Sequence, residues 1–243
     1  MRLDVYLSSS SLVKSRTEAK GFITSGAVLV NGKTVTKPSF EVSEEDQISV
    51  DTSTKRFVSR GGLKLEYALS FFSVDPKGKI CLDVGASSGG FTDCLLKSGA
   101  ARVVAVDSGS GQLVSEIRED SRVAVFENYN ARYMKPADFD CAPSLAVMDV
   151  SFISSTYIMP SVYGVLEEGG DFVLLIKPQF EVGRSGLKKG GIVKDEATAE
   201  LAVKRVIDFA KNVGFSFIGV TRSPITGGDG NTEYLAHFKK IPV

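Results

Sequence analysis

The sequence predicts a doubly wound α/β sheet that follows a small α+β module. From residue 79 onward, short apolar runs alternate with longer segments of helical periodicity, a pattern typical of a parallel sheet with helices on both faces. Residues 1–54 instead combine a helix with a hairpin. At 243 residues, the chain is long enough to bury a substantial core in one domain or two.

The first 54 residues contain the signals of a compact unit. Apolar residues recur at helical spacing over residues 12–23, which predicts a helix. Residues 27–36 predict a hairpin, because Asn31-Gly32 favours a type I′ turn, and residues 47–50 predict a further strand. We therefore expect residues 1–54 to form a separate small domain.

The charge of the chain is balanced overall but uneven along it. Its 29 Lys and Arg residues equal its 29 Asp and Glu residues, so overall basicity does not indicate a nucleic-acid partner. Residues 1–37 nevertheless hold six bases against two acids. Basic side chains on a helix and near a hairpin can follow RNA phosphates, although a solvated helix face would carry the same charges. The candidate RNA contacts of this module are Arg2, Lys14, Arg16 and Lys20.

Residues 55–60 are expected to link this module to a second domain over residues 61–243, which opens with a helix over residues 63–71. Strands are expected near residues 79–82, 102–106, 122–126, 144–148, 171–176, 215–221 and 233–238, and helices near residues 89–98, 110–118, 154–167 and 196–213. The turn-rich segment 227–231 favours a hairpin, so the terminal strand is expected to run antiparallel.

A glycine-rich turn follows the first strand of the second domain. Glycines let the backbone approach a ligand closely, and the helix that follows offers free N–H groups. Asp107 ends the next strand. It follows the turn by roughly 20 residues, the spacing at which a carboxylate in such folds binds ribose hydroxyls. The turn is neither G-x-G-x-x-G nor a Walker motif, so an adenosine cofactor without a pyrophosphate, S-adenosylmethionine, fits best. The candidate cofactor-binding residues are Asp83, Gly85, Ala86, Ser87, Gly89, Asp107, Asn130, Ala131 and Asp149.

Four charged residues are expected to face one crevice. Ligands of an open parallel sheet lie at the carboxyl ends of the strands, and Asp149 and Lys177 each follow an apolar strand. Glu233 begins the last strand, which places it at the same edge if that strand is antiparallel. Lys64 lies on the helix that leads into the sheet. A lone charge at a strand end is usually solvated, but four at corresponding positions favour a shared site.

These motifs resemble those of known families. Arg2-Leu3-Asp4, Ser15-Arg16 and Val28-x-Val30-Asn31-Gly32 are similar to the S4 RNA-binding domain. Lys64, Asp149, Lys177 and Glu233, in this order, resemble the catalytic tetrad of FtsJ-type ribose 2′-O-methyltransferases. The combination resembles the TlyA (hemolysin-A-like) family, and the segments that carry the resemblance are residues 59–65, 83–95, 149–154, 176–181 and 190–195.

The resemblance implies an architecture and an activity. The expected fold is a Rossmann-like methyltransferase sheet with an antiparallel terminal strand, preceded by an α+β RNA-binding domain. The expected reaction is S-adenosylmethionine-dependent methylation of a cytidine 2′-hydroxyl in ribosomal RNA, with ribosomal subunits as partners. Lys177 would meet the hydroxyl, Asp149 would orient Lys177 and favour the sulfonium by its charge, and Lys64 and Glu233 would complete the network.

A long glycine-rich loop follows the fifth predicted strand. Residues 177–194 hold five bases against one acid, which suits an RNA backbone, although a disordered solvated loop would look similar. Long loops of this kind beside a site are often lids. The further candidate RNA contacts are Arg60, Arg184, Lys188 and Lys189.

Several classes of function are disfavoured. One histidine and three scattered cysteines make a His/Cys metal site or a disulfide framework improbable. No apolar run approaches the roughly 18 residues of a membrane span, and the start lacks the apolar stretch of a secretion signal. We therefore expect no metal, no membrane partner and a cytoplasmic location. The alternatives to an enzyme are a non-catalytic RNA-binding or ribosome assembly factor and a hemolysin, the latter suggested by the family label alone.

Overall fold

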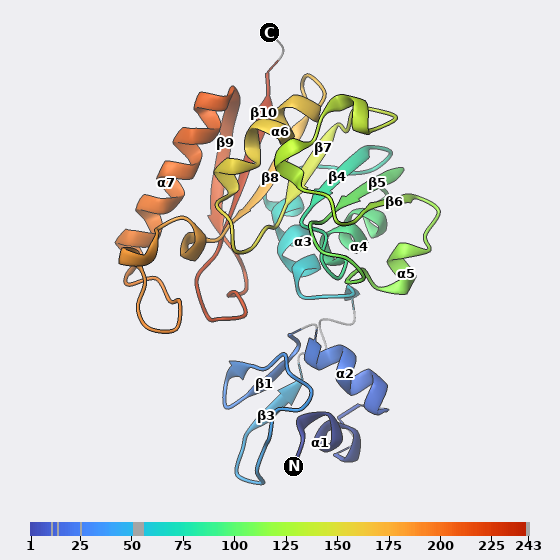
Figure 1. The fold of residues 1–243 in the computed structure, drawn as a ribbon, viewed down its shortest axis with the longest axis vertical. Helices are drawn as coiled ribbons and strands as arrows, with labels where there is room; N and C mark the ends of the chain where they lie inside the picture. The colour runs from blue at the N-terminus through green and yellow to red at the C-terminus, as the bar shows by residue number, and fades with distance from the viewer. Residues whose placement is uncertain (11, 14, 25, 51–55, 242–243) are drawn as a thin grey trace.

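The computed structural model describes residues 1–241 except residues 11, 14, 25 and 51–55. Its described residues form two units, a small one up to residue 50 and a large one from residue 56 (Figure 1). The small unit contains α1 (Leu3–Ser9), α2 (Arg16–Thr24), β1 (Val28–Val30), β2 (Lys33–Thr34) and β3 (Ile48–Val50). Strand β1 pairs antiparallel with both of its neighbours, in the order β2-β1-β3.

The small unit contains a helix that the sequence pattern did not reveal. The expected helix over residues 12–23 is α2, which begins four residues later, and α1 precedes it. Helix α1 has seven residues, too few for a clear period, yet Leu3 and Leu7 lie one turn apart and are fully buried. They pack against Ile23 and Val28 in the core of this unit.

The large unit is a seven-stranded sheet in the order β6-β5-β4-β7-β8-β10-β9. Strands β4 to β8 run parallel to one another, and β10 runs antiparallel to both β8 and β9. The predicted fold class and the antiparallel terminal strand are therefore confirmed. The strands are β4 (Ile80–Val84), β5 (Arg102–Val106), β6 (Val123–Phe126), β7 (Leu145–Met148), β8 (Asp171–Ile176), β9 (Phe215–Arg222) and β10 (Tyr234–Lys240).

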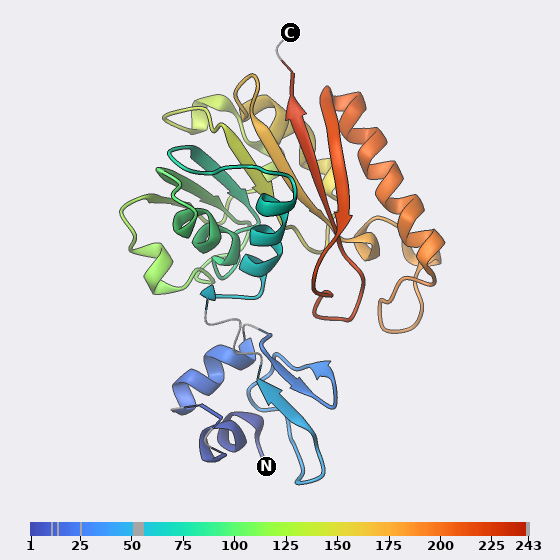
Figure 2. The same cartoon turned by 180° about the vertical axis from the view of Figure 1, so that it is seen from behind.

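Helices cover both faces of this sheet (Figures 1 and 2). Alternate residues of one strand belong to opposite cores, since the side-chain period of a strand is two. Val103 packs in the core beneath α3 and α4, whereas Val104 packs in the core beneath α6 and α7. The helices are α3 (Gly61–Phe71), α4 (Gly90–Lys97), α5 (Ser115–Arg118), α6 (Met159–Val165) and α7 (Glu196–Val213).

The strand order creates a switch point between β4 and β7. From β4 the chain proceeds outward through β5 and β6, then returns to the other side of β4 as β7. Connections on the two sides diverge there, so a crevice opens at the carboxyl ends of β4 and β7. These ends face the small unit (Figures 1 and 2).

The segment that joins the two units packs against the large one. Phe57 is buried in the core beneath α3 and α4, and the backbone N–H of Val58 donates to Asp93 of α4. A Cβ on Gly62 would lie 2.3 Å from the Phe57 ring, so the glycine allows this close approach. Residues 55–60, expected as a linker, are therefore docked from Phe57 onward, and residue 55 lies outside the described residues.

In the part of the chain that the structure describes, no helix has the length and apolarity needed to cross a membrane.

Candidate active site

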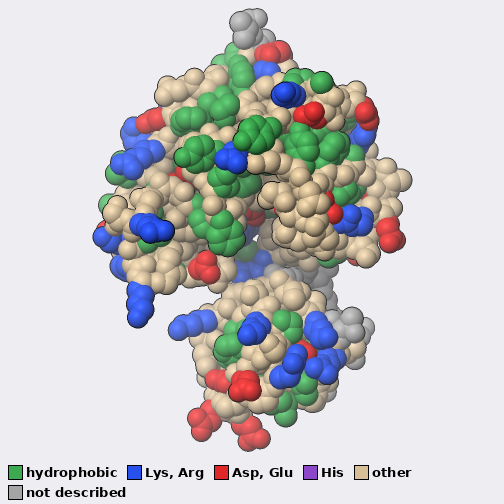
Figure 3. Space-filling view, viewed as in Figure 1, with side chains coloured by type: hydrophobic (Ala, Val, Ile, Leu, Met, Phe, Trp, Pro, Cys, Tyr) green, Lys and Arg blue, Asp and Glu red, His purple; other side chains and the backbone are tan. Residues whose placement is uncertain are grey.

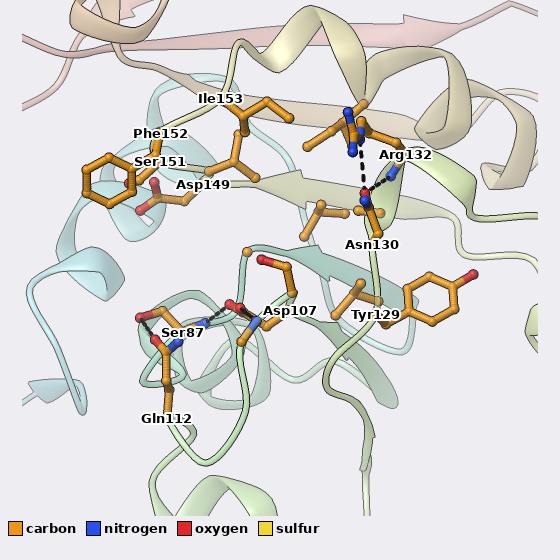
Figure 4. Close-up of a pocket in the computed structure, with 18 residues that line it drawn as sticks. Ser87, Asp107, Gln112, Tyr129, Asn130, Arg132, Asp149, Ser151, Phe152 and Ile153 are labelled. Atoms are coloured by element: carbon orange, nitrogen blue, oxygen red, sulfur yellow. Dashed lines mark hydrogen bonds between the residues drawn. The ribbon is translucent and has the colours of Figure 1, made fainter.

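A cavity of about 520 Å³ opens at the carboxyl ends of β4, β5 and β7 (Figure 4). It lies at the switch point of the sheet, where a ligand is expected. Of the residues that the sequence predicted to bind a cofactor, six line it: Gly85, Ser87, Asp107, Asn130, Ala131 and Asp149.

The glycine-rich turn passes directly beside the end of β7. Gly85 has a φ of 87°, and a Cβ at this position would lie 2.2 Å from the backbone oxygen of Asp149. Only glycine fits such an approach. The N–H of Gly85 donates to the carbonyl of Val106 at 2.8 Å, which holds the turn between β5 and β7.

Asp107 fixes the shape of the cavity from the end of β5. One carboxylate oxygen accepts the backbone N–H of Ser87 at 2.8 Å, and the other accepts that of Gly109 at 2.7 Å. The side chain borders the cavity beside Ser87 (Figure 4). Each carboxylate oxygen has a further lone pair, so Asp107 can also accept the two hydroxyls of a ribose.

Three predicted cofactor residues lie beneath the turn instead of on the cavity wall. Ala86 is buried, and Gly89 is the N-cap of α4, with a φ of 97°; a Cβ on Gly89 would lie 3.0 Å from Leu113 and 3.2 Å from Ile117. Asp83 is fully buried and accepts a 2.6 Å hydrogen bond from the Thr92 hydroxyl. Its other oxygen has no hydrogen-bond partner among the described residues.

Burial raises the pKa of Asp83 to about 7. The hydrogen bond from Thr92 lowers this pKa, whereas the nearby carboxylates of Asp149 and Asp107 raise it. An unpartnered buried oxygen on a carboxyl that ionises near neutrality suits a cationic ligand group such as an ammonium. The residues present therefore fit the amino acid portion of S-adenosylmethionine.

This raised pKa gives a testable pH dependence. Because the ammonium of S-adenosylmethionine favours ionised Asp83, binding should release a proton, and affinity should fall about fivefold from pH 7 to pH 6. Without ligand, the folded pKa exceeds the unfolded one, so the free energy of unfolding should fall as pH rises from about 4 to about 7. Isothermal titration in buffers of different ionisation enthalpy measures the proton release.

The Asp83→Asn variant should bind more weakly and without this pH dependence. Asp140→Asn is the control, because the Asp140 side chain is 79% exposed and distant from the turn in its ion pair with Arg102. A wild-type affinity that stays constant from pH 6 to pH 7 would contradict the role of Asp83.

The far end of the cavity combines polar and apolar groups. Asn130 precedes a short helical turn and accepts the backbone N–H of Arg132 (Figure 4). Ile153 and Ile158 supply apolar surface, which suits a flat adenine ring. These isoleucines and Gln112, whose side chain accepts the Ser87 hydroxyl at 3.3 Å, were missed from sequence because isolated residues in loops belong to no motif.

The four charged residues of the predicted tetrad form two ion pairs. Nζ of Lys64 lies 2.5 Å from Oε2 of Glu233, and both residues are more than nine-tenths buried. Nζ of Lys177 lies 2.5 Å from Oδ1 of Asp149 and donates to the hydroxyl of Ser151 at 2.8 Å. Charged pairs this close and this desolvated are strongly interdependent, since removal of one partner leaves the other unpaired.

A second hollow of about 230 Å³ is lined by one member of each pair. Lys64 and Asp149 both line it, and Asp149 also lines the larger cavity. The opposite wall comes from Gly26 and Thr34 of the small unit. One hollow thus offers space for an adenosine ligand, and the adjoining hollow offers space for a second substrate beside the ion pairs.

Arg60 joins the two units at this hollow. Its guanidinium donates to the carbonyl of Gly26, the hydroxyl of Thr34 and the carbonyl of Thr226. The five N–H donors of an arginine leave two available beyond these three bonds. Arg60, predicted as an RNA contact, is therefore also an interdomain contact.

The other candidate RNA contacts lie on the outside of the molecule. Arg2 and Arg16 both pair with buried Asp4 at 3.0 Å, and their side chains stay 47% and 52% exposed. The hydrogen bond from Arg2 is the main cause that lowers the Asp4 pKa to about 2. Lys14 lies outside the described residues. The remaining candidates are exposed: Lys20, Arg184, Lys188 and Lys189.

The basic loop after β8 has a defined fold. Leu187 and Val193 form an antiparallel bridge, and the buried side chain of Asn231 bonds to the N–H of Val193 and the carbonyl of Gly191. Figure 3 shows Lys and Arg side chains over the small unit and along the left side of the large one, with a hollow between the units.

Across the described ranges, no group of three or more His, Cys, Asp or Glu residues could hold a metal ion.

A doubly wound sheet with one antiparallel strand, a glycine turn at the switch point and an acid at the end of the next strand defines an S-adenosylmethionine-dependent methyltransferase. Residues 57–240 match the FtsJ-like methyltransferase family, and residues 1–48 match the S4 domain. The chain therefore belongs to the TlyA (hemolysin A) family, in which an S4 domain precedes an FtsJ-like methyltransferase domain.

Named relatives cover nearly the whole chain. It is 46% identical to Hemolysin A of Brachyspira hyodysenteriae, over 98% of this chain and 99% of that protein. It is 42% identical to the 16S/23S rRNA (cytidine-2'-O)-methyltransferase TlyA of Mycobacterium tuberculosis, over 96% of this chain and 88% of that one. A solved Streptococcus thermophilus structure that bears a hemolysin name has a TM-score of 0.79 at 43% identity, over 99% and 88% of the two chains.

Proposed function

We propose that this protein methylates the 2′-hydroxyl of a cytidine in ribosomal RNA. The observation that carries the proposal is a hollow lined by one member of each lysine–carboxylate pair, Lys64 and Asp149, of which Asp149 also lines the cofactor cavity. Relatives at 42% identity are named for this reaction on 16S and 23S rRNA. We also propose a cytoplasmic location, where a ribosomal RNA substrate would be found.

The chemistry of a ribose hydroxyl explains the residue types. S-adenosylmethionine supplies a methyl group on a sulfonium. The hydroxyl is a poor nucleophile near neutral pH, so it must be aligned with that methyl and relieved of its proton, which passes to Nζ of Lys177 as Lys177 gives one of its own to the Asp149 carboxylate. Nζ of Lys177 is the group that holds the hydroxyl, and its position is fixed by the ion pair with Asp149 and by the hydrogen bond to Ser151.

The second pair holds the substrate from the opposite side. Lys64 and Glu233 neutralise each other in a buried position, so Lys64 presents an N–H group to the ribose without an uncompensated charge. Gly227 lets the loop before β10 close around the carboxylate, since a Cβ there would lie 2.6 Å from Oε1 of Glu233.

The proposed division of labour follows the chain. Residues 1–54 bind RNA, residues 55–60 connect, and residues 61–243 bind the cofactor and carry out the transfer. The hollow between the units admits the target nucleotide, because its walls are hydroxyl groups and cations such as Thr34, Arg60 and Lys64.

The experiment that tests the proposal is methyl transfer to purified ribosomal subunits from cells that lack this protein. Labelled methyl should enter ribosomal RNA at a cytidine whose 3′ phosphodiester becomes resistant to alkali, because a methylated 2′ oxygen cannot attack it. A folded protein that binds S-adenosylmethionine and transfers no methyl to either subunit would contradict the proposal.

The basic loop provides a separate prediction about affinity. Substitution of both Lys188 and Lys189 by glutamate should raise KM for ribosomal RNA at least about tenfold at low salt, because two phosphate contacts become repulsive. The Kd for S-adenosylmethionine should stay the same. Lys77→Glu is the control, since Lys77 is exposed before β4, at the edge of the sheet away from the site. An unchanged KM would exclude this loop from RNA binding.

A further inference from the structure

Glu181 connects two loops that carry the predicted catalytic pair. It lies four residues after Lys177, beyond a short helical turn over Pro178–Phe180. Its Oε1 accepts the backbone N–H of Ser155 at 2.9 Å and the hydroxyl of Ser155 at 2.8 Å. Its Oε2 accepts the hydroxyl of Ser154 at 2.5 Å. Three hydrogen bonds to a carboxylate make this the densest polar contact between the described parts of the two loops.

The loop after β7 is therefore held at both of its ends. Asp149 begins the loop and pairs with Lys177, while Ser154 and Ser155 end it and bond to Glu181. Residues 149–155 and 177–181 thus run side by side. The ion pair of Asp149 with Lys177 lies at one end of their contact, and Glu181 lies at the other.

The middle of the same loop is strained. Phe152 has a φ of 65°, a left-handed conformation that is costly for a residue with a large side chain. Its side chain is 92% exposed, and its only described ring contact is Phe180 of the other loop, at 5.3 Å between ring centroids. Such a conformation persists only where the surroundings fix it, and here Lys177 holds Ser151 on one side of Phe152 while Glu181 holds Ser154 and Ser155 on the other.

We propose that Glu181 is a positioning residue for the methyl transfer. Its carboxylate clamps residues 149–155 to residues 177–181. This contact keeps Asp149 within ion-pair distance of Lys177 and keeps residues 150–153 on the wall of the cofactor cavity. The proposal rests on the function proposed above. It assigns Glu181 no contact with substrate, because Glu181 lines neither the cofactor cavity nor the hollow beside it.

Water cannot readily replace the hydrogen bonds that Glu181 accepts, because Ser155 is buried. Ser155 is 2% exposed, so loss of the carboxylate would leave its N–H and hydroxyl without partners in a buried place. The loop would then shift until these groups reach water. A shift of about 1 Å in a catalytic group is enough to lower turnover about 100-fold.

Two substitutions remove the bond in which Glu181 accepts from Ser154. Glu181→Gln can keep its amide oxygen on Ser155 but loses the oxygen that accepts from Ser154, and Ser154→Ala removes the donor of that bond together with the contacts that Ser154 makes to Thr156. Each should lower kcat about tenfold, and the double variant should be no slower than the slower single variant, because the bond is already absent. Glu181→Ala removes all three bonds and should lower kcat about 100-fold.

A structural role alone would not give this pattern. We expect KM for ribosomal RNA and Kd for S-adenosylmethionine to stay within about threefold in Glu181→Gln, because its amide oxygen keeps the bonds to Ser155 that hold residues 150–153 on the cavity wall. Deuterium uptake of residues 150–155 should rise in Glu181→Ala. Glu200→Gln is the control and should match wild type, because Glu200 is an exposed acid on α7.

The outcomes separate the two proposals. Wild-type protein that methylates no ribosomal RNA would overturn the function and the positioning role together. Active wild type with an unchanged kcat in Glu181→Ala would overturn the positioning role alone. Multiplicative losses in the Glu181→Gln, Ser154→Ala double variant would show that the two side chains act separately and would likewise overturn it.

Discussion

Replacement of Lys177 by alanine should lower kcat for methyl transfer about 10³-fold, while S-adenosylmethionine still binds with wild-type affinity. The amine that holds the ribose hydroxyl is lost, and general acid–base groups contribute on this scale. Lys177 is absent from the lining of the cofactor cavity, so its loss should leave Kd unchanged. Tritiated-methyl incorporation into ribosomal subunits and isothermal titration measure the two quantities.

Lys204→Ala is the matched control for this substitution. Nζ of Lys204 also lies 2.5 Å from a carboxylate, that of Asp208, but the pair is on the exposed face of α7. Exposed pairs of this kind contribute little, so kcat should stay at the wild-type value. Turnover by Lys177→Ala within tenfold of wild type would remove Lys177 from the mechanism, and loss of cofactor binding would reassign it to the cofactor site.

Gly85→Ala should abolish detectable binding of S-adenosylmethionine and lower the free energy of unfolding by about 2–5 kcal/mol. The new Cβ would lie 2.2 Å from the backbone oxygen of Asp149, and neither atom belongs to a side chain that can rotate away. The turn and the end of β7 would have to separate, which deforms the cavity and moves Asp149. Isothermal titration and thermal unfolding measure both effects.

Gly78→Ala is the control for Gly85→Ala, because it has the cost of a positive φ without the steric clash. Gly78 has a φ of 71°, and a Cβ there meets nothing within 4 Å. This variant should lose only about 1–2 kcal/mol of stability and bind S-adenosylmethionine normally. If Gly85→Ala were no more harmful than Gly78→Ala, the close approach between the turn and Asp149 would not be needed for the site.

The sequence predicted the large sheet well because its strands are short apolar runs bounded by turn residues. The predicted strands over residues 102–106 and 171–176 coincide with β5 and β8. The helix expected over residues 110–118 is reduced to α5, since residues 107–112 instead wrap the cavity, with the Gly109 N–H on Asp107. A loop that lines a cavity has no helical or strand periodicity in its sequence, so the pattern could not reveal it.

The candidate site was predictable where it depended on strand ends. Asp149 and Lys177 follow adjacent parallel strands, and Glu233 precedes the antiparallel one, so topology alone brings them together. Glu181 and Ile158 could not be found in this way, because their positions depend on how loops fold over the sheet. The pairing of Lys64 with Glu233, 169 residues apart, likewise required the packing of α3 beside β10.

Arg60 links the two units beside the proposed catalytic residues. It caps α3, and Lys64 lies one helical turn further along the same helix. The arginine bonds at once to the small unit and to Thr226, in the segment that leads to Glu233. A tilt of the small unit that keeps these bonds would pull on the first turn of α3, so we expect RNA bound to the small unit to shift the proposed Lys64–Glu233 pair.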